Sequence, residues 1–137
     1  MAAKSDVWLG FARTAVASHA QSCGHEYRCP TELTLDVLGG KWKTVILCFL
    51  NQRSCRYAEL RKLMPNLSDK ILTERLTDLV ESGLVLKKRA PGQARIAVYV
   101  LTDRARSLRD LLRDLYVWGK SHAAEFGVEI EDALKNL

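Results

Sequence analysis

The order of local patterns in residues 53–95 restricts the fold more than any other feature of this chain. Two short stretches, 56–64 and 68–82, carry apolar residues at helical spacing and are separated by the helix-breaking pair Pro65–Asn66. Two strand-like stretches, 84–89 and 95–101, follow and are joined by a turn over 90–94. Helix, tight turn, helix and hairpin in this order predict a winged helix-turn-helix. The fold class expected is therefore mainly α with a small β-hairpin (α+β).

The rest of the chain extends this unit on both sides. Its segments are a first amphipathic helix over 5–20, a polar linker over 21–30, a short helix over 31–38, a buried helix over 41–50, a long final helix from Thr102 to near Gly119, and an acidic tail over 123–137 with room for one short helix. We divide the chain into an N-terminal helical extension and linker (1–28), a winged-helix domain (29–120) and a C-terminal tail (121–137).

Positive charge is concentrated in the same region. Residues 53–95 hold ten Lys and Arg against five Asp and Glu, whereas the remaining residues hold eleven of each. A cationic surface on a helix-turn-helix scaffold is typical of proteins that bind double-stranded DNA. No apolar run is long enough to cross a membrane and no signal peptide pattern opens the chain, so we expect a cytoplasmic protein.

The stretch 68–82 is the expected DNA-reading helix, and the hairpin is the expected wing. Ser68 is a good N-cap, and Gly83 stands where a left-handed residue would end the helix. The predicted buried face is Ile71, Leu72, Leu76, Leu79 and Val80. The residues expected to contact DNA are Ser68, Asp69, Lys70, Thr73, Glu74, Arg75 and Thr77 on the helix, with Lys87, Lys88, Arg89 and Arg95 around the hairpin tip. The plainer interpretation is a solvated polar face and a solvated charge run.

Four cysteines raise the question of redox sensing. Cys29 follows Arg28 and precedes a predicted helix N-terminus, and both features favour a thiolate. A disulfide between Cys23 and Cys29, or one between subunits, is a plausible switch, and Cys55 is a second candidate sensor beside two arginines. Cys48 falls on a buried helix and is expected to be inert. Cys23, His25 and Cys29 match no structural zinc pattern, so we expect neither a metal nor a cofactor.

Two copies are expected to act together. The first and last helices are both amphipathic and neither completes the reading head, so we expect them to form a homodimer that binds a palindromic operator. Intramolecular packing is the other use for such helices. A small-molecule effector, such as an aromatic ligand near Trp42, Tyr57 and Trp118, is an alternative to oxidation.

Two further function classes are less well supported. A thiol-based redox enzyme would use Cys23 and Cys29, but the chain has no C-x-x-C pair and no evident base for a nucleophile. An architectural DNA binder would show no preference among duplexes, whereas a regulator prefers its own operator by on the order of a thousandfold.

Several short motifs resemble the HxlR-type regulators, a branch related to the MarR-type winged-helix proteins. They are Cys29-Pro30, the run T-L-D-V-L-G-G-K-W-K over 34–43, Y-A-E-L-R over 57–61, L-M-P-N-L-S-D-K-I-L-T over 63–73, L-V-E-S-G-L-V over 79–85, Y-V-L-T over 99–102 and Trp118-Gly119. The resemblance implies a homodimeric bacterial transcription factor that reads DNA with the helix beginning at Ser68. It also implies a redox- or electrophile-responsive repressor acting through Cys29, because a cysteine before this Pro is often the sensor. Arg95 lies one residue farther from Tyr99 than the family pattern has it, so its contact is the least certain of the set.

Overall fold

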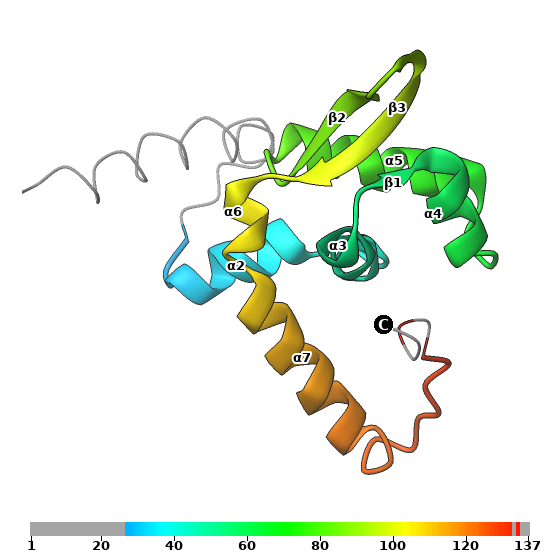
Figure 1. The fold of residues 1–137 in the computed structure, drawn as a ribbon. Coiled ribbons are helices and arrows are strands. Elements are labelled where there is room, and N and C mark those ends of the chain that lie inside the picture. The colour runs from blue at the N-terminus through cyan, green and yellow to red at the C-terminus, as the bar shows by residue number, and fades with distance from the viewer. Residues whose placement is uncertain (1–26, 133, 135–137) are drawn as a thin grey trace, which may run out of the picture.

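The computed structural model describes residues 27–132 and 134, which fold around one hydrophobic core (Figure 1). The first helix expected over 5–20 and most of the linker lie outside the described residues. The elements are α2 (Pro30–Leu38), α3 (Lys43–Gln52), β1 (Cys55–Arg56), α4 (Tyr57–Leu63), α5 (Asp69–Glu81), β2 (Val85–Ala90), β3 (Gln93–Leu101), α6 (Asp103–Arg106) and α7 (Arg109–His122). This order is the predicted winged helix-turn-helix. Among the described helices, none combines the length and the apolar character needed to cross a membrane.

The sheet has one more strand than the sequence patterns predicted. It is antiparallel in the order β1-β3-β2, with Cys55 opposite Tyr99 and Val85 opposite Leu101. β1 has only two residues, too short to give an alternating pattern of its own. It is a strand because β3 offers it an open edge, which is a tertiary cause.

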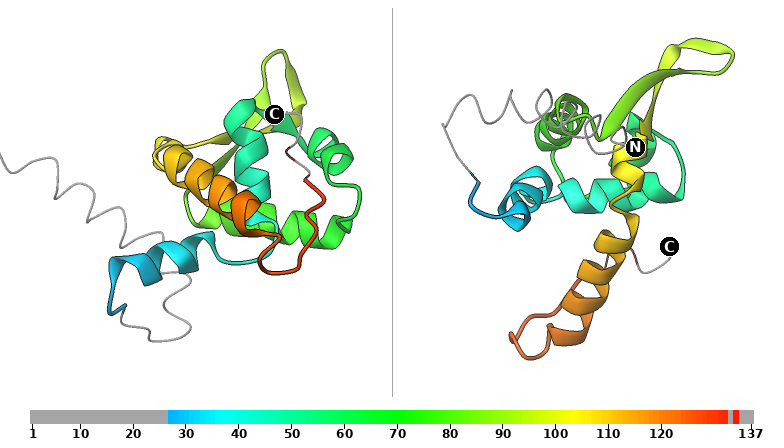
Figure 2. Two further views of the ribbon diagram at one scale, coloured as in Figure 1. Left: turned by 90° about the horizontal axis from the view of Figure 1, so that it is seen from below. Right: turned by 90° about the vertical axis from the view of Figure 1, so that its left-hand side faces the viewer.

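The core forms where α3, α4 and α5 pack against the sheet. Apolar residues at helical spacing on the three helices meet the inward residues of β2 and β3. The most deeply buried side chains are Ile46, Leu47, Leu60, Leu72, Leu76, Leu79, Leu84, Val85 and Cys55. Figures 1 and 2 show the hairpin and α7 projecting from different sides of this body.

The final helix is broken, contrary to the continuous helix expected from Thr102. Thr102 does act as an N-cap, since its hydroxyl accepts from the Ala105 N–H at 3.2 Å, but the helix it caps is the four-residue α6. The Ser107 hydroxyl donates to the Arg104 carbonyl at 2.6 Å, and the Leu108 N–H reaches back only three residues, to Ala105. Such local serine bonding and a tightened turn interrupt an α-helix.

The helix also ends later than expected. α7 passes through Gly119, near which the sequence predicts its end, and continues to His122. Glycine inside a helix costs about 1 kcal/mol relative to alanine, which packing elsewhere can offset. In this last turn the ring of His122 stacks on Trp118 at 4.7 Å between centroids, and His122 Nδ1 lies 2.9 Å from the Trp118 carbonyl oxygen. Residues 123–127 form turns and residues 128–132 have no regular secondary structure, so the short helix allowed for the tail is not found in these described residues.

Candidate nucleic-acid interface

α5 presents a polar face to the outside and an apolar face to the core. Leu72, Leu76 and Leu79 are buried, as expected. The predicted outer residues are all exposed, namely Asp69, Lys70, Thr73, Glu74 and Thr77. Ile71 is half-buried. Val80, expected in the core, is 36% exposed, because it lies on the edge of the apolar stripe where no other element covers it.

Both ends of α5 have the predicted caps. The Ser68 hydroxyl accepts from the Ile71 N–H at 3.2 Å. At the other end Gly83 takes a left-handed φ of +70°, and the Gly83 and Leu84 N–H groups donate back to the Val80 and Leu79 carbonyls. This pair of bonds is the Schellman arrangement, which terminates a helix and satisfies its last carbonyls. The length of the reading helix is therefore fixed locally by its own sequence.

Asp69 is tied to the preceding helix and locks the turn between α4 and α5. Its Oδ1 accepts from the Tyr57 hydroxyl at 2.8 Å and from the Arg61 Nε at 3.0 Å. Arg61 also donates to the Met64 and Pro65 carbonyls in the turn. Sequence reasoning counted Asp69 as a DNA contact and overlooked Arg61. The signal was present, because Tyr57 and Arg61 stand four residues apart and so share the face of α4 that meets the start of α5.

The outer face of α5 keeps polar groups free to meet a ligand. The Thr77 hydroxyl donates to the Thr73 carbonyl at 2.9 Å, which restrains its rotamer, and both residues are exposed. Among the described residues, Lys70 and Glu74 form no ion pair, and both are exposed. An unpaired ammonium near a helix N-terminus, where backbone N–H groups also point outward, is suited to a phosphate.

Arg75 has a structural partner on its own helix. Its guanidinium NH1 lies 2.9 Å from Asp78 Oδ2, and the same oxygen lies 3.8 Å from the ammonium of Lys43, a residue only 5% exposed. Gly40 has a φ of +104° and sits directly against the Arg75 and Lys43 side chains. Within the Gly-Gly-Lys-Trp-Lys run, Gly40 and Lys43 thus pack beside Asp78 of α5. This role was missed, because nothing local in the sequence pairs Lys43 with Asp78.

The wing is formed by β2 and β3, with Pro91 and Gly92 at its tip. Gly92 has a φ of +72°, so the pair fits a type II turn. The expected five-residue turn is therefore shorter, and Lys87, Lys88 and Arg89 lie along β2 and not at the tip. All three side chains are exposed, as is that of Arg95 on β3. Successive strand residues face opposite sides, so Lys88 is on the other face from its two neighbours.

The described cysteines have different environments. Cys29 is exposed and is the N-cap residue of α2, where the neighbouring Thr31 hydroxyl and N–H favour the thiolate and lower the pKa of its thiol. Cys55 is buried in the core, where desolvation raises the pKa of its thiol. Burial also raises the pKa of the half-buried Cys48. Cys23 lies outside the described residues. Among the described residues, the conditions for a reactive thiolate are met best at Cys29.

The three aromatic residues expected near a ligand space have different described partners. The Tyr57 hydroxyl donates to Asp69, Trp42 packs against the core with the Lys41 ammonium 5.3 Å from its ring, and Trp118 stacks on His122. No cluster of three or more metal-binding side chains occurs within the part of the chain that the structure describes.

Comparison with known proteins agrees with this geometry. Residues 37–126 match the family described as HxlR-like helix-turn-helix. The chain belongs to the HxlR-like helix-turn-helix family. Its members are transcriptional regulators and not enzymes, which confirms the predicted family, fold class and DNA-binding class and removes the redox-enzyme alternative.

Individual relatives support the assignment over most of the chain. The HTH-type transcriptional regulator YtcD of Bacillus subtilis strain 168 is 39% identical over 100 residues, covering 71% of this chain and 77% of YtcD. The redox regulator HypR in its reduced form is 31% identical with a TM-score of 0.66, covering 72% of this chain and 98% of that one. The reduced form of YodB from B. subtilis is 27% identical with a TM-score of 0.59, covering 68% and 92%. HypR is a redox regulator.

Proposed function

We propose that this HxlR-like regulator binds a palindromic operator as a homodimer and that oxidation of Cys29 changes its affinity for that operator. The observation that carries the DNA part is the exposed polar face of α5, held by Asp69 against α4 and flanked by the exposed basic strand β2. Lys70, Thr73 and Thr77 would meet the major groove, and Lys87, Lys88, Arg89 and Arg95 the backbone or minor groove. Arg75, paired with Asp78, would act by orienting the helix. A regulator of this kind would act in the cytoplasm.

The dimer part of the proposal rests on α7. Leu112 faces the core, whereas Leu111, Leu115 and Trp118 form a second stripe that is 38–56% exposed. A monomer gains nothing from a second apolar stripe in water, while a second copy of the chain would bury both stripes together. Leu115→Glu would place a carboxylate in that contact. We expect it to convert the dimer to a monomer in sedimentation experiments, whereas the exposed polar change Ser121→Glu on the same helix leaves the dimer intact.

The redox part rests on the environment of Cys29. A thiolate at this position would attack the O–O bond of hydrogen peroxide, forming a sulfenic acid and releasing hydroxide. A second thiol would then displace water from the sulfenic acid to give a disulfide, so that two thiols are oxidised as one peroxide is reduced to two waters. Cys23 of the same chain or a cysteine of the second copy would supply that thiol, and peptide mapping of the oxidised protein identifies which. Cys55 is the weaker candidate because it is buried with a raised thiol pKa.

One experiment tests both parts. Duplexes bound by reduced and by oxidised protein are selected from a random library, and the affinity of the selected operator is then measured for variants. We expect Lys70→Gln to weaken operator binding by tenfold or so, the loss of one charge-assisted contact. Lys120→Gln, an equal loss of charge on α7, serves as the control. If the reduced protein enriches no sequence, the DNA assignment is refuted. If Cys29→Ser responds to oxidant like the wild type, Cys29 is not the sensor. Cys48→Ser is the control and should keep the oxidant response.

A further inference from the structure

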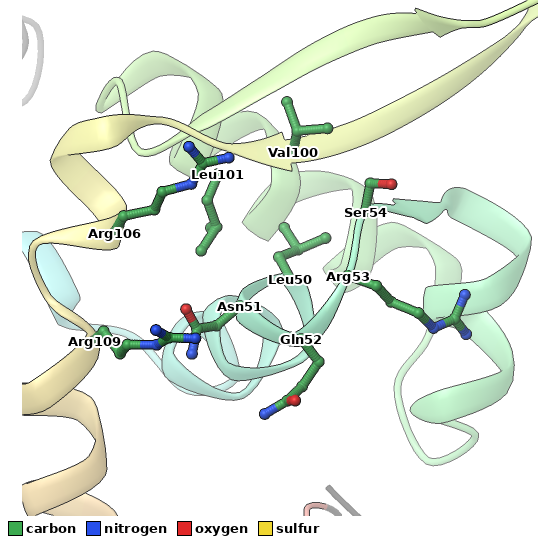
Figure 3. A pocket seen from close by; sticks show the side chains of 9 residues that line it. All are labelled: Leu50, Asn51, Gln52, Arg53, Ser54, Val100, Leu101, Arg106 and Arg109. Carbon is green, nitrogen blue, oxygen red and sulfur yellow. The ribbon is translucent and has the colours of Figure 1, made fainter.

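A basic pocket lies where the C-terminal end of α3 meets β3 and the junction of α6 with α7 (Figure 3). It has a volume of about 510 Å³ and is lined by Leu50, Asn51, Gln52, Arg53, Ser54, Val100, Leu101, Arg106 and Arg109. This volume lies within the ~300–1,000 Å³ range of small-molecule sites. The pocket shares none of its lining with the aromatic space that the sequence suggested.

The cations of this pocket lack strong partners. Arg109 forms no ion pair with any described residue, and Arg106 meets only Asp103, at 3.3 Å, where both side chains are largely exposed and the pair contributes little. Arg53 is turned away in Figure 3, because it is bound to Glu59 at 2.7 Å. None of the described residues that line the pocket carries a carboxylate. Two guanidinium groups therefore face a hollow that supplies no negative charge of its own.

The remaining lining has two characters. Leu50 and Leu101 give the hollow an apolar wall, while the Asn51 amide lies beside Arg109 and can hydrogen-bond to a polar group. Guanidinium groups bind carboxylates through paired hydrogen bonds, and an apolar wall favours a carbon skeleton over a bare inorganic anion. We propose that this pocket is a site for a small organic carboxylate, held by Arg106 and Arg109 with its hydrocarbon part against the leucines.

The pocket lies at the C-terminal end of α3, and the ion pair between α3 and α5 lies at its N-terminal end. Lys43, the first residue of α3, is paired with Asp78 of α5, and Asn51 and Gln52 at its last turn line the pocket. The helix between them is ten residues long, about 15 Å. Arg109 is also the first residue of α7, so an occupant would bridge the reading head and the proposed dimer helix. Regulation of DNA binding by the occupant rests on the proposed function, whereas binding itself requires neither DNA nor a dimer.

The test is calorimetry of the reduced full chain with 2-naphthoate as the probe and 2-naphthamide as its neutral analogue. We expect one naphthoate per chain and at least about tenfold weaker binding of the amide, because hydrogen bonds to charged groups contribute about 1.5–3 kcal/mol. The variant Arg106→Gln/Arg109→Gln should lose naphthoate binding by about tenfold or more. Circular dichroism verifies that the variant is folded.

Arg113→Gln is the matched control. It makes the same charge change one turn along α7, at a residue outside this pocket that already meets Asp110 and Asp114. We expect it to bind naphthoate like the wild type. Equal binding of naphthoate and naphthamide, full binding by the folded double variant, or a loss in Arg113→Gln as large as in the double variant would each overturn the assignment. Because no DNA is present, these outcomes are independent of whether the operator selection succeeds.

Discussion

The ion pair between Lys43 and Asp78 gives the sharpest test of how α5 is held. Unit charges 3.8 Å apart attract by about 4 kcal/mol at an effective dielectric constant of 20. Asp78→Asn keeps the shape of the side chain but leaves the Lys43 ammonium, 5% exposed, beside the Arg75 guanidinium with no neutralising charge. Leaving a buried charge without its partner costs roughly 3–5 kcal/mol. Asp78 is 23% exposed, so we expect the lower end, about 3 kcal/mol.

Removing the lysine should have a much smaller effect. Lys43→Met deletes the buried charge and retains a chain of similar length, while Asp78 keeps its bond to Arg75, so we expect a change within about 1 kcal/mol. The double variant Lys43→Met/Asp78→Asn should recover most of the stability that Asp78→Asn loses, because no ammonium is then left buried. The two effects are therefore strongly non-additive, as expected for groups in direct contact.

Urea unfolding followed by far-ultraviolet circular dichroism measures these differences. With a slope of about 1.5 kcal/mol per molar urea, Asp78→Asn should lower the midpoint by about 2 M. All variants are compared at one protein concentration, because dimerisation would make stability concentration-dependent. Equal losses in the two single variants, with a double variant equal to their sum, would refute the reasoning.

Three further outcomes are expected. Lys88→Gln/Arg89→Gln should flatten the dependence of log affinity on log salt by up to about two units for each wing, because each phosphate contact contributes about 0.9. The smaller change of about one unit is expected if only one of these two side chains, which lie on opposite faces of β2, contacts a phosphate; an unchanged slope in salt titrations would place the wing off the backbone. Iodoacetamide reacts with the thiolate, so the lowered pKa of Cys29 and the raised pKa of Cys48 should allow Cys29 to be alkylated at lower pH than Cys48. Mass spectrometry of the labelled protein measures this order, and the reverse order would exclude a stabilised thiolate at Cys29. Ser68→Ala should cost about 1 kcal/mol in urea unfolding by removing the N-cap of α5, and Ser68→Asp should not; equal losses would show that the cap hydrogen bond is not the cause.

Much of the reading head could be predicted from the sequence because its determinants are local. The N-cap at Ser68, the left-handed Gly83 and the three buried leucines of α5 each depend on residues within one or two helical turns. The sites that the sequence missed depend on contacts between distant segments. Arg61 reaches across a turn to Asp69, and Arg109 joins the end of α3 only because the chain bends at Ser107.

The amino-acid sequence by itself determined the order of elements, the concentration of charge in residues 53–95 and the helix caps, because propensity, periodicity and capping act over a few residues. Only the tertiary structure decided that β1 is a strand, that Val80 is exposed, that Lys43 is buried against Asp78 and that two arginines share a pocket. These features depend on which surfaces meet. Burial and charge pairing across long sequence separations follow from packing, which no local pattern encodes.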